Sequence, residues 1–213
     1  MPLENRVDPY GTIFRTPARG TFLGNRGGAL HNDSRQIVRP YKSRRWIACV
    51  LEFKGRKRTI MAPNCYTELF FLDEAVAFAA GHRPCAECRR QRFNAFKNAW
   101  KHRDGSNSTS DPYADDIDLE LDRHRIDRRR MKVTYQAQLD SLPNGSFVEI
   151  DQAPYLVWDD ALLLWTPECY TKSTHRSPDR MVTVLTPQPI VDCFRQGYRP
   201  EIHSSSRALI PQH

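Results

Sequence analysis

The segment Glu74–Cys88, EAVAFAAGHRPCAEC, constrains the fold of this chain more than any other stretch of its sequence. Its apolar first half predicts a short helix, and Gly81 can take the left-handed conformation that ends one. Pro84 then fixes the backbone just ahead of Cys85, and Cys88 follows at C-x2-C spacing. That spacing lets two thiolates point at one tetrahedral Zn²⁺ ion without backbone strain. The segment therefore predicts half of a structural zinc site.

Two other interpretations of this cysteine pair compete with the zinc site. C-x2-C is also a redox motif, and two neighbouring thiols can lie buried without any ligand. We favour the metal because Gly81 and Pro84 both preform the turn that carries the thiols.

The same residues carry a resemblance to a known family. The sequence around them resembles the zinc-binding domain of the Ada methylation-repair protein and similar modules fused to some nucleases, in which a strand and a helix with an EA pair precede AG-aromatic-RPCxxC. The resemblance covers about residues 66–88, and its matching residues are Leu69–Phe71, Glu74-Ala75, Ala80–Pro84, Cys85 and Cys88. His82 stands where the family has an aromatic residue. The resemblance implies a structural Zn²⁺ ion and a nucleic-acid context.

Two further metal ligands have to come from elsewhere, because the Ada-type pair C-x3-C or H-x4-C ahead of the strand is missing. We rank His31 and Cys49 first. His31 follows GNRGGAL, which resembles the stretch before the first ligand in the nuclease-fused modules. Cys49 falls on the apolar face of the predicted strand Trp46–Phe53, where a core thiol is the competing interpretation. Cys65, in a turn, and His82, beside the cysteine pair, are the alternatives.

Positive charge is concentrated in one part of the chain. The net charge is +7, and residues 35–60 contain nine Lys or Arg and one acid. We expect a β-hairpin of Trp46–Phe53 and Lys57–Met61 whose basic tip contacts phosphates beside aromatic side chains, followed by the amphipathic helix Arg89–Lys101 with one cationic face. An ordinary solvated basic surface is the alternative. The predicted nucleic-acid-binding residues are Arg44, Arg45, Trp46, Lys54, Arg56, Lys57, Arg58, Arg89, Arg90 and Arg92.

The sequence predicts an α+β fold in two parts. A zinc-stabilised domain of a β-hairpin and helices is expected at residues 1–101, and a linker with a charged amphipathic helix at 102–130. A small antiparallel β-rich domain with a C-terminal helix is then expected at 131–213. Its predicted strands, parted by turns, are Val133–Leu139, Ser146–Ile150, Tyr155–Trp158, Leu162–Trp165 and Met181–Leu185. That last helix is followed by GYRP, which repeats the GHRP after the first helix, and we interpret both as helix stops.

No stretch is apolar enough for a membrane span, the first residues lack a signal-peptide pattern, and the six cysteines are irregularly spaced. We therefore expect a cytoplasmic protein without a membrane partner. No HExxH, GxSxG or Walker sequence announces an enzyme.

The expected function is that of a zinc-containing protein that binds nucleic acid, DNA before RNA, in repair or defence. One alternative is an enzyme acting on nucleic acid, such as a nuclease, a glycosylase or a zinc-thiolate alkyl acceptor. Another is an assembly component that binds a protein partner, since a basic surface attracts carboxylates as well as phosphates.

Overall fold

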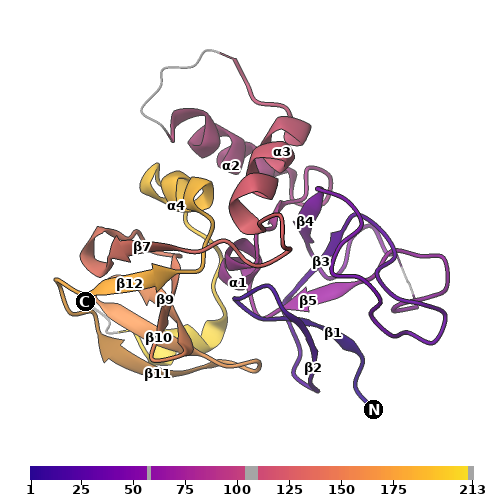
Figure 1. The fold of residues 1–213 in the computed structure, drawn as a ribbon, viewed down its shortest axis with the longest axis horizontal. Coiled ribbons are helices and arrows are strands. Elements are labelled where there is room, and N and C mark those ends of the chain that lie inside the picture. Colours follow the sequence, from indigo (N-terminus) through magenta and orange to yellow (C-terminus); the bar gives the residue numbers. More distant parts are fainter. Residues whose placement is uncertain (57–58, 104–109, 211–213) are drawn as a thin grey trace.

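The chain has an α+β fold, in which the described residues form two six-stranded sheets and four α-helices. The computed structural model describes residues 1–56, 59–103 and 110–210. Figure 1 shows the two sheets side by side, with helix α1 between them and α2, α3 and α4 gathered along one side. None of the helices in the described ranges is long and apolar enough to cross a membrane.

The first sheet is mixed, with the strand order β2-β1-β5-β3-β4-β6. Its strands are β1 (Glu4–Val7), β2 (Ile13–Arg15), β3 (Phe22–Arg26), β4 (Trp46–Cys49), β5 (Leu69–Phe71) and β6 (Arg83–Pro84). Strand β3 pairs antiparallel with both β4 and β5, whereas the short β6 runs parallel to β4 at the sheet edge. This last pairing brings distant parts of the sequence together.

The second sheet is antiparallel throughout, with the order β11-β10-β9-β8-β12-β7. Its strands are β7 (Tyr135–Gln138), β8 (Phe147–Ile150), β9 (Ala153–Trp158), β10 (Ala161–Trp165), β11 (Tyr170–His175) and β12 (Met181–Val184). The β-rich C-terminal half expected from the sequence is thus present as one sheet.

The helices are α1 (Glu74–Ala79), α2 (Arg90–His102), α3 (Ala114–Arg125) and α4 (Gln188–Arg195), with 3₁₀ turns at Leu139–Ser141 and Ser204–Ala208. Helices α1 and α4 end alike. Gly81 and Gly197 lie just beyond their C-terminal ends with φ of 85° and 89°. The N–H of the residue after each glycine donates back to a helix carbonyl, His82 to Ala77 O and Tyr198 to Cys193 O. Both GxRP sequences are therefore helix stops of the Schellman type, as predicted.

The core extends across both sheets. One buried cluster contains Leu69 and Phe71 of β5 together with Phe147, Leu156 and Leu163 of the second sheet. A second cluster joins the helices through aromatic rings, and its members include Phe78, Phe96, Phe194 and Tyr198. The apolar face of the amphipathic helix predicted after the cysteine pair is therefore core.

One expectation about strands was wrong, and one strand of the second sheet was not predicted. The predicted hairpin does not form in the described residues: β4 ends at Cys49 and pairs with β3 and β6, while residues 59–61 form no strand. Only a turn remains, in which Arg56 N–H donates to Phe53 O at 3.1 Å. Strand β11 was missed, because its residues, YTKSTH, are mostly polar and lie at a sheet edge.

Candidate metal centre

Three cysteine thiols lie together at the edge of the first sheet. The sulfur atoms of Cys49, Cys85 and Cys88 are all within 4.8 Å of one another. Zn–S bonds of about 2.3 Å at tetrahedral angles put sulfurs about 3.8 Å apart, so these three atoms are close enough to share one ion. In the described part of the chain no disulfide joins any cysteine, and no other group of three such ligands occurs. The cluster is therefore a candidate metal site.

The pairing of β6 with β4 assembles this cluster. Ala48 lies opposite Pro84 in the parallel pair, and Cys85 N–H donates to Ala48 O at 2.9 Å. Cys49 follows Ala48 and Cys85 follows Pro84, so their thiols lie at the same end of the parallel pair. The C-x2-C turn then brings Cys88 to the same place. Cys49 is half-buried, whereas Ala48 is buried in the core, so the core-thiol interpretation of Cys49 does not fit its position.

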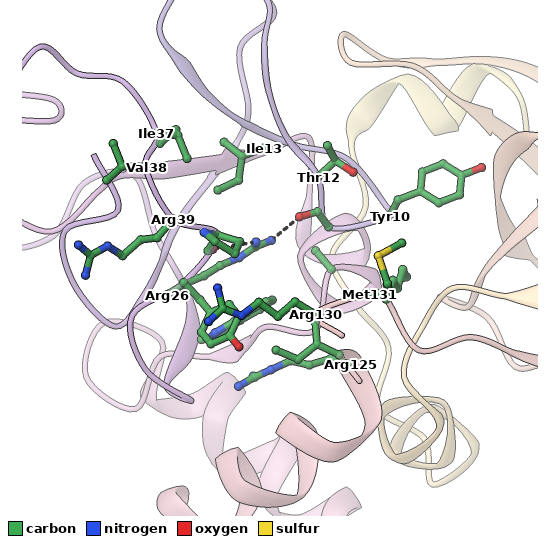
Figure 2. A pocket seen from close by; sticks show the side chains of 17 residues that line it. Tyr10, Thr12, Ile13, Arg26, Ile37, Val38, Arg39, Arg125, Arg130 and Met131 are labelled. Carbon is green, nitrogen blue, oxygen red and sulfur yellow. Dashed lines mark hydrogen bonds between the residues drawn. The ribbon is translucent and has the colours of Figure 1, made fainter. Parts of the chain in front are cut away.

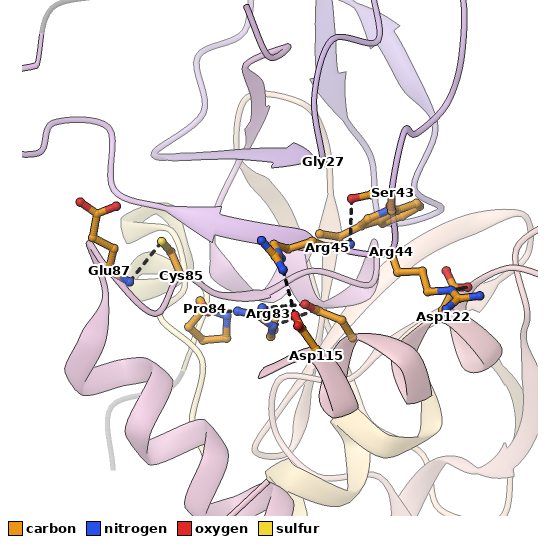
Figure 3. A network of polar contacts seen from close by, with 12 residues as sticks. Gly27, Ser43, Arg44, Arg45, Arg83, Pro84, Cys85, Glu87, Asp115 and Asp122 are labelled. Atoms are coloured by element: carbon orange, nitrogen blue, oxygen red, sulfur yellow. Dashed lines mark hydrogen bonds and ion pairs between the residues drawn. The ribbon is translucent and has the colours of Figure 1, made fainter. Parts of the chain in front are cut away.

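A backbone N–H group of the C-x2-C turn points at the sulfur of Cys85. Glu87 N–H donates to Cys85 Sγ at 3.4 Å (Figure 3). Hydrogen bonds from the thiols of Cys49 and Cys88 lower the pKa of Cys85, and the same contact with Cys85 raises the pKa of Cys49. Three thiolates this close repel one another unless a cation lies between them. A soft divalent metal ion supplies that cation, so the donor set fits a thiolate-bound metal.

His31 lies outside the cluster. Its Nδ1 is 2.6 Å from Thr67 Oγ1 and its Nε2 is 3.2 Å from the carbonyl oxygen of Ala62. A carbonyl can only accept, so Nε2 carries the proton and Nδ1 accepts from the hydroxyl. Both ring nitrogens are thus satisfied within the fold, and the structure gives no support to His31 as a ligand. Of the two candidates ranked first, it brings only Cys49 to the cysteine pair.

The two alternative ligands are also elsewhere. Cys65 is exposed on the loop before β5. His82 is fully buried with its ring against Trp46 and Phe71, and its Nε2 accepts from Arg26 Nε at 3.3 Å. Burial, together with neighbouring arginines, holds the pKa of His82 well below its ordinary value. His82 is therefore a neutral core residue.

Several residues predicted to bind nucleic acid make contacts inside the protein instead. Trp46 is only 3% exposed, with the guanidinium carbons of Arg26 and Arg125 at 4.0 and 4.2 Å from its ring centroid, so this ring cannot stack on a base. Arg89 is buried and pairs with Glu74 at 2.5 Å. The predicted roles of Trp46 and Arg89 are corrected by this burial. Arg92 is half-buried and also pairs with Glu74.

Other predicted residues lie on the surface, each beside a carboxylate, and Figure 3 shows Arg44 and Arg45 with theirs. The pairs are Arg44–Asp122 at 3.2 Å, Arg45–Asp115 at 2.9 Å and Arg56–Glu87 at 2.8 Å. Lys54 and Arg90 are exposed and have no carboxylate partner among the described residues. Lys57 and Arg58 lie outside the described residues.

A second group of cations was not singled out from the sequence. We define the basic rim as five exposed cations: Arg39, Lys42, Arg128, Arg129 and Arg130. They lie on two loops, before β4 and after α3, and have no carboxylate partner in the described chain. The loops line one cavity from two sides. The run of six Lys or Arg in Arg123–Lys132 was the available signal, but its position beside residues 39–42 requires the fold.

Comparison with known proteins returned no matching family model, no matching curated protein and no matching solved structure.

Proposed function

We propose that this chain is a zinc protein in which Cys49, Cys85 and Cys88 hold one structural Zn²⁺ ion, and that its basic rim binds nucleic acid. The thiol cluster carries the proposal. Thiolates favour Zn²⁺ over hard cations such as Mg²⁺ and Ca²⁺. The resemblance of the C-x2-C turn to the Ada-type domain supports the same ion and a similar structural role.

The ion would join the ends of three neighbouring elements. Cys49 closes β4, Cys85 follows β6, and Cys88 precedes α2. Metal-binding free energy at such a site is folding free energy, because the unfolded chain has no preformed site. Zinc would therefore stabilise the edge of the first sheet and the start of α2.

Metal analysis of the purified protein tests the zinc proposal. We expect a single zinc ion per chain, lost in Cys49→Ser, Cys85→Ser and Cys88→Ser but retained in Cys169→Ser, a half-buried cysteine outside the cluster. His31→Ala should retain the ion. Cys65→Ser tests the fourth ligand: loss of the ion would identify Cys65 as a fourth thiolate, and retention would leave that position to water. Full zinc content in Cys49→Ser, or a folded protein that takes up no zinc, would refute the proposal.

The basic rim supports the nucleic-acid part of the proposal. Its side chains are exposed, and no carboxylate neutralises them in the described residues, so phosphates can replace their water shells. The surface pairs of Arg44 and Arg45 are weak, and each can exchange its carboxylate for a phosphate. We favour DNA over RNA because the resemblance is to DNA-repair modules.

Gel shifts with duplex DNA, single-stranded DNA and RNA over a salt series test this part. Affinity should fall steeply as salt rises, because bound phosphates release counterions. Arg128→Glu with Arg129→Glu should weaken binding at least about tenfold, since each lost phosphate contact removes a charge-assisted bond. The matched control reverses two exposed cations elsewhere, Lys172→Glu with Arg207→Glu, and should bind normally. Equal loss in both double variants, or no binding at low salt, would reject the basic rim.

The enzymatic alternatives have a direct assay. Labelled duplex and single strands incubated with the protein and Mg²⁺ or Mn²⁺ should remain intact if the chain only binds. Cleavage or base release would assign it to the enzymes that act on nucleic acid.

A further inference from the structure

A cavity of about 730 Å³ lies between the two loops that carry the basic rim. Its walls come from the turn between β1 and β2, the loop before β4 and the loop after α3, and it reaches inward to Arg26, Trp46 and Arg125. Volumes of roughly 300–1,000 Å³ are typical of small-molecule sites. None of the thiol ligands of the candidate metal centre lines it.

The charged residues that line the cavity are all positive. Five lining residues are cationic, namely Arg26, Arg39, Arg125, Arg130 and Lys132, and no Asp or Glu lines the cavity. Figure 2 shows Arg26, Arg125 and Arg130 gathered on one side of it, while Arg39 extends away at the edge. Arg125 alone among these five has a carboxylate partner in the described chain, Asp122 at 3.0 Å. The field inside the cavity therefore favours an anion.

Arg26 is the most informative of these cations. Its side chain is 2% exposed, yet its three hydrogen-bond partners are neutral acceptors: His82 Nε2, Pro40 O at 3.3 Å and Gly11 O at 2.9 Å. A guanidinium has five N–H groups, so one on each terminal nitrogen remains available. An isolated buried charge is strongly unfavourable without a counter-ion. Burial and the neighbouring Arg125 lower the pKa of Arg26 to about 9, although the carboxylate of Asp8 opposes this shift.

The rest of the lining is apolar. Ile13, Ile37 and Val38 form one wall, Met131 lies on the other side, and Tyr41 adds an aromatic ring. An inorganic ion would leave most of this surface and volume unfilled. The cations approach from three separate segments, which suits a tetrahedral dianion better than a planar carboxylate that takes one guanidinium fork. The occupant therefore combines a phosphate group with an apolar or aromatic body.

We propose that this cavity binds a nucleoside monophosphate, with its phosphate held by Arg26, Arg125 and Arg130 and its base against Ile13, Ile37 and Tyr41. The ligand is either a free nucleotide or the phosphorylated 5′ end of a strand, since both present the same group. The site does not rest on the zinc ion or on nucleic-acid binding by the exposed rim.

Calorimetric titration of the full chain with the four 5′-nucleoside monophosphates, adenosine and inorganic phosphate tests the proposal. At least one monophosphate should bind, and adenosine should bind at least about tenfold more weakly than AMP, because charge-assisted hydrogen bonds are lost. Failure of all four monophosphates to bind, or equal affinity for AMP and adenosine, would overturn the site. Binding of inorganic phosphate alone would overturn the ligand class.

Two variants locate the binding. Arg130→Ala should weaken binding of the monophosphate about tenfold, whereas Lys172→Ala, which removes an exposed cation of β11 outside the lining and outside the basic rim, should not. Arg26→Met should abolish binding, and its fold is checked by circular dichroism. Because Arg130 is exposed, its variant keeps the test valid even if Arg26→Met unfolds. Equal affinity of Arg130→Ala and wild type would refute the assignment.

Oligonucleotides then distinguish the two sources. A single strand with a 5′ phosphate should bind more tightly than its 5′-hydroxyl counterpart and than AMP if the ligand is a strand end. Equal binding of the two strands, with tight binding of AMP, would identify a free nucleotide. Salt-dependent binding of blunt duplex without a 5′ phosphate reports on the rim alone, so the two proposals fail separately.

Discussion

Lys132 follows α3 and donates from Nζ to the carbonyl of Ala79 at 2.6 Å. It forms no ion pair with any carboxylate of the described chain, and burial lowers its pKa to about 7, although Asp8 opposes this shift and Arg26 adds to it. The folded state therefore disfavours the charged form of this lysine. Between about pH 7 and pH 10 the unfolded chain binds more protons at this residue than the folded chain does, so its contribution to stability rises with pH. The full penalty is present below pH 7.

Lys132→Met should accordingly stabilise the protein most at neutral pH. Its advantage over wild type should shrink by up to about 3 kcal/mol between about pH 7 and pH 10, because wild-type Lys132 becomes neutral in that window. Urea denaturation of both proteins across this range measures the difference. Lys172→Met, at an exposed position of β11, is the control and should show a difference that does not vary with pH. A constant difference for Lys132→Met would contradict the prediction.

At the same scale, the sequence indicated Cys85 and Cys88 as candidate metal ligands, because their C-x2-C spacing is a local feature of the sequence. Cys49 was a candidate on an equal footing with His31, since its role depends on the pairing of β4 with β6. His31 was chosen from the resemblance of the residues before it, which says nothing about Thr67 and its hydroxyl. Candidate ligands on distant strands come together only in the tertiary structure, which a rule about sequence spacing does not contain.

Helix α3 supplies carboxylates to arginines of β6 and of the loop before β4. Its Asp118 accepts from Arg83 Nε at 2.8 Å and Nη2 at 2.7 Å, and these side chains are 4% and 3% exposed. Asp115 of the same helix pairs instead with exposed Arg45. Because Arg83 belongs to β6, the buried pair holds the short strand that delivers Cys85 to the thiol cluster.

Asp118→Asn should therefore destabilise the fold by about 3–5 kcal/mol, since it leaves a buried guanidinium without its counter-charge. It should also speed the transfer of the proposed zinc ion to a chelator, because β6 is less firmly held. Asp115→Asn is the matched control on α3 and should cost less than about 1 kcal/mol, as expected for an exposed pair. Denaturant titration and a colorimetric chelator measure both effects. Similar losses in the two variants would show that burial of the pair is not the cause.

Elements with a strong local pattern were predicted well. Helix α2 and strands β8, β10 and β12 lie within a residue or two of the expected places, because periodicity and turn residues are written in the sequence. The hairpin after β4 failed for the opposite reason. A basic turn with Gly55 predicts reversal of the chain, but both edges of β4 are already paired, one with β3 and the other with β6. Strand partners are set by the whole sheet.

At the scale of the molecule, helix α1 joins the two halves of the chain. Asp73, at its N-terminus, accepts from the hydroxyl of Tyr170 at 2.7 Å. Glu74 accepts from the hydroxyl of Tyr198 at 2.6 Å and from the N–H of Glu201 at 2.8 Å. Both acids are buried, so each depends on partners supplied by the C-terminal half.

The predicted division into residues 1–101, 102–130 and 131–213 places one sheet in each outer part, and the contacts of α1 cross between these parts. Residues 1–130 produced alone should lack a cooperative thermal transition even with zinc, because Asp73 and Glu74 lose buried partners and the core loses Phe147 and Leu163. The intact chain should melt in a single transition.

Circular dichroism and proton–nitrogen NMR spectra of the fragment check this expectation. Mixing fragments 1–130 and 131–213 is the positive control, since their association restores the shared core and should recover a cooperative transition. A dispersed spectrum and an independent transition for residues 1–130 would show that the first sheet and its metal centre suffice to fold. The contacts of α1 would then serve only to dock two autonomous domains, and zinc would be the dominant stabilising term of the first.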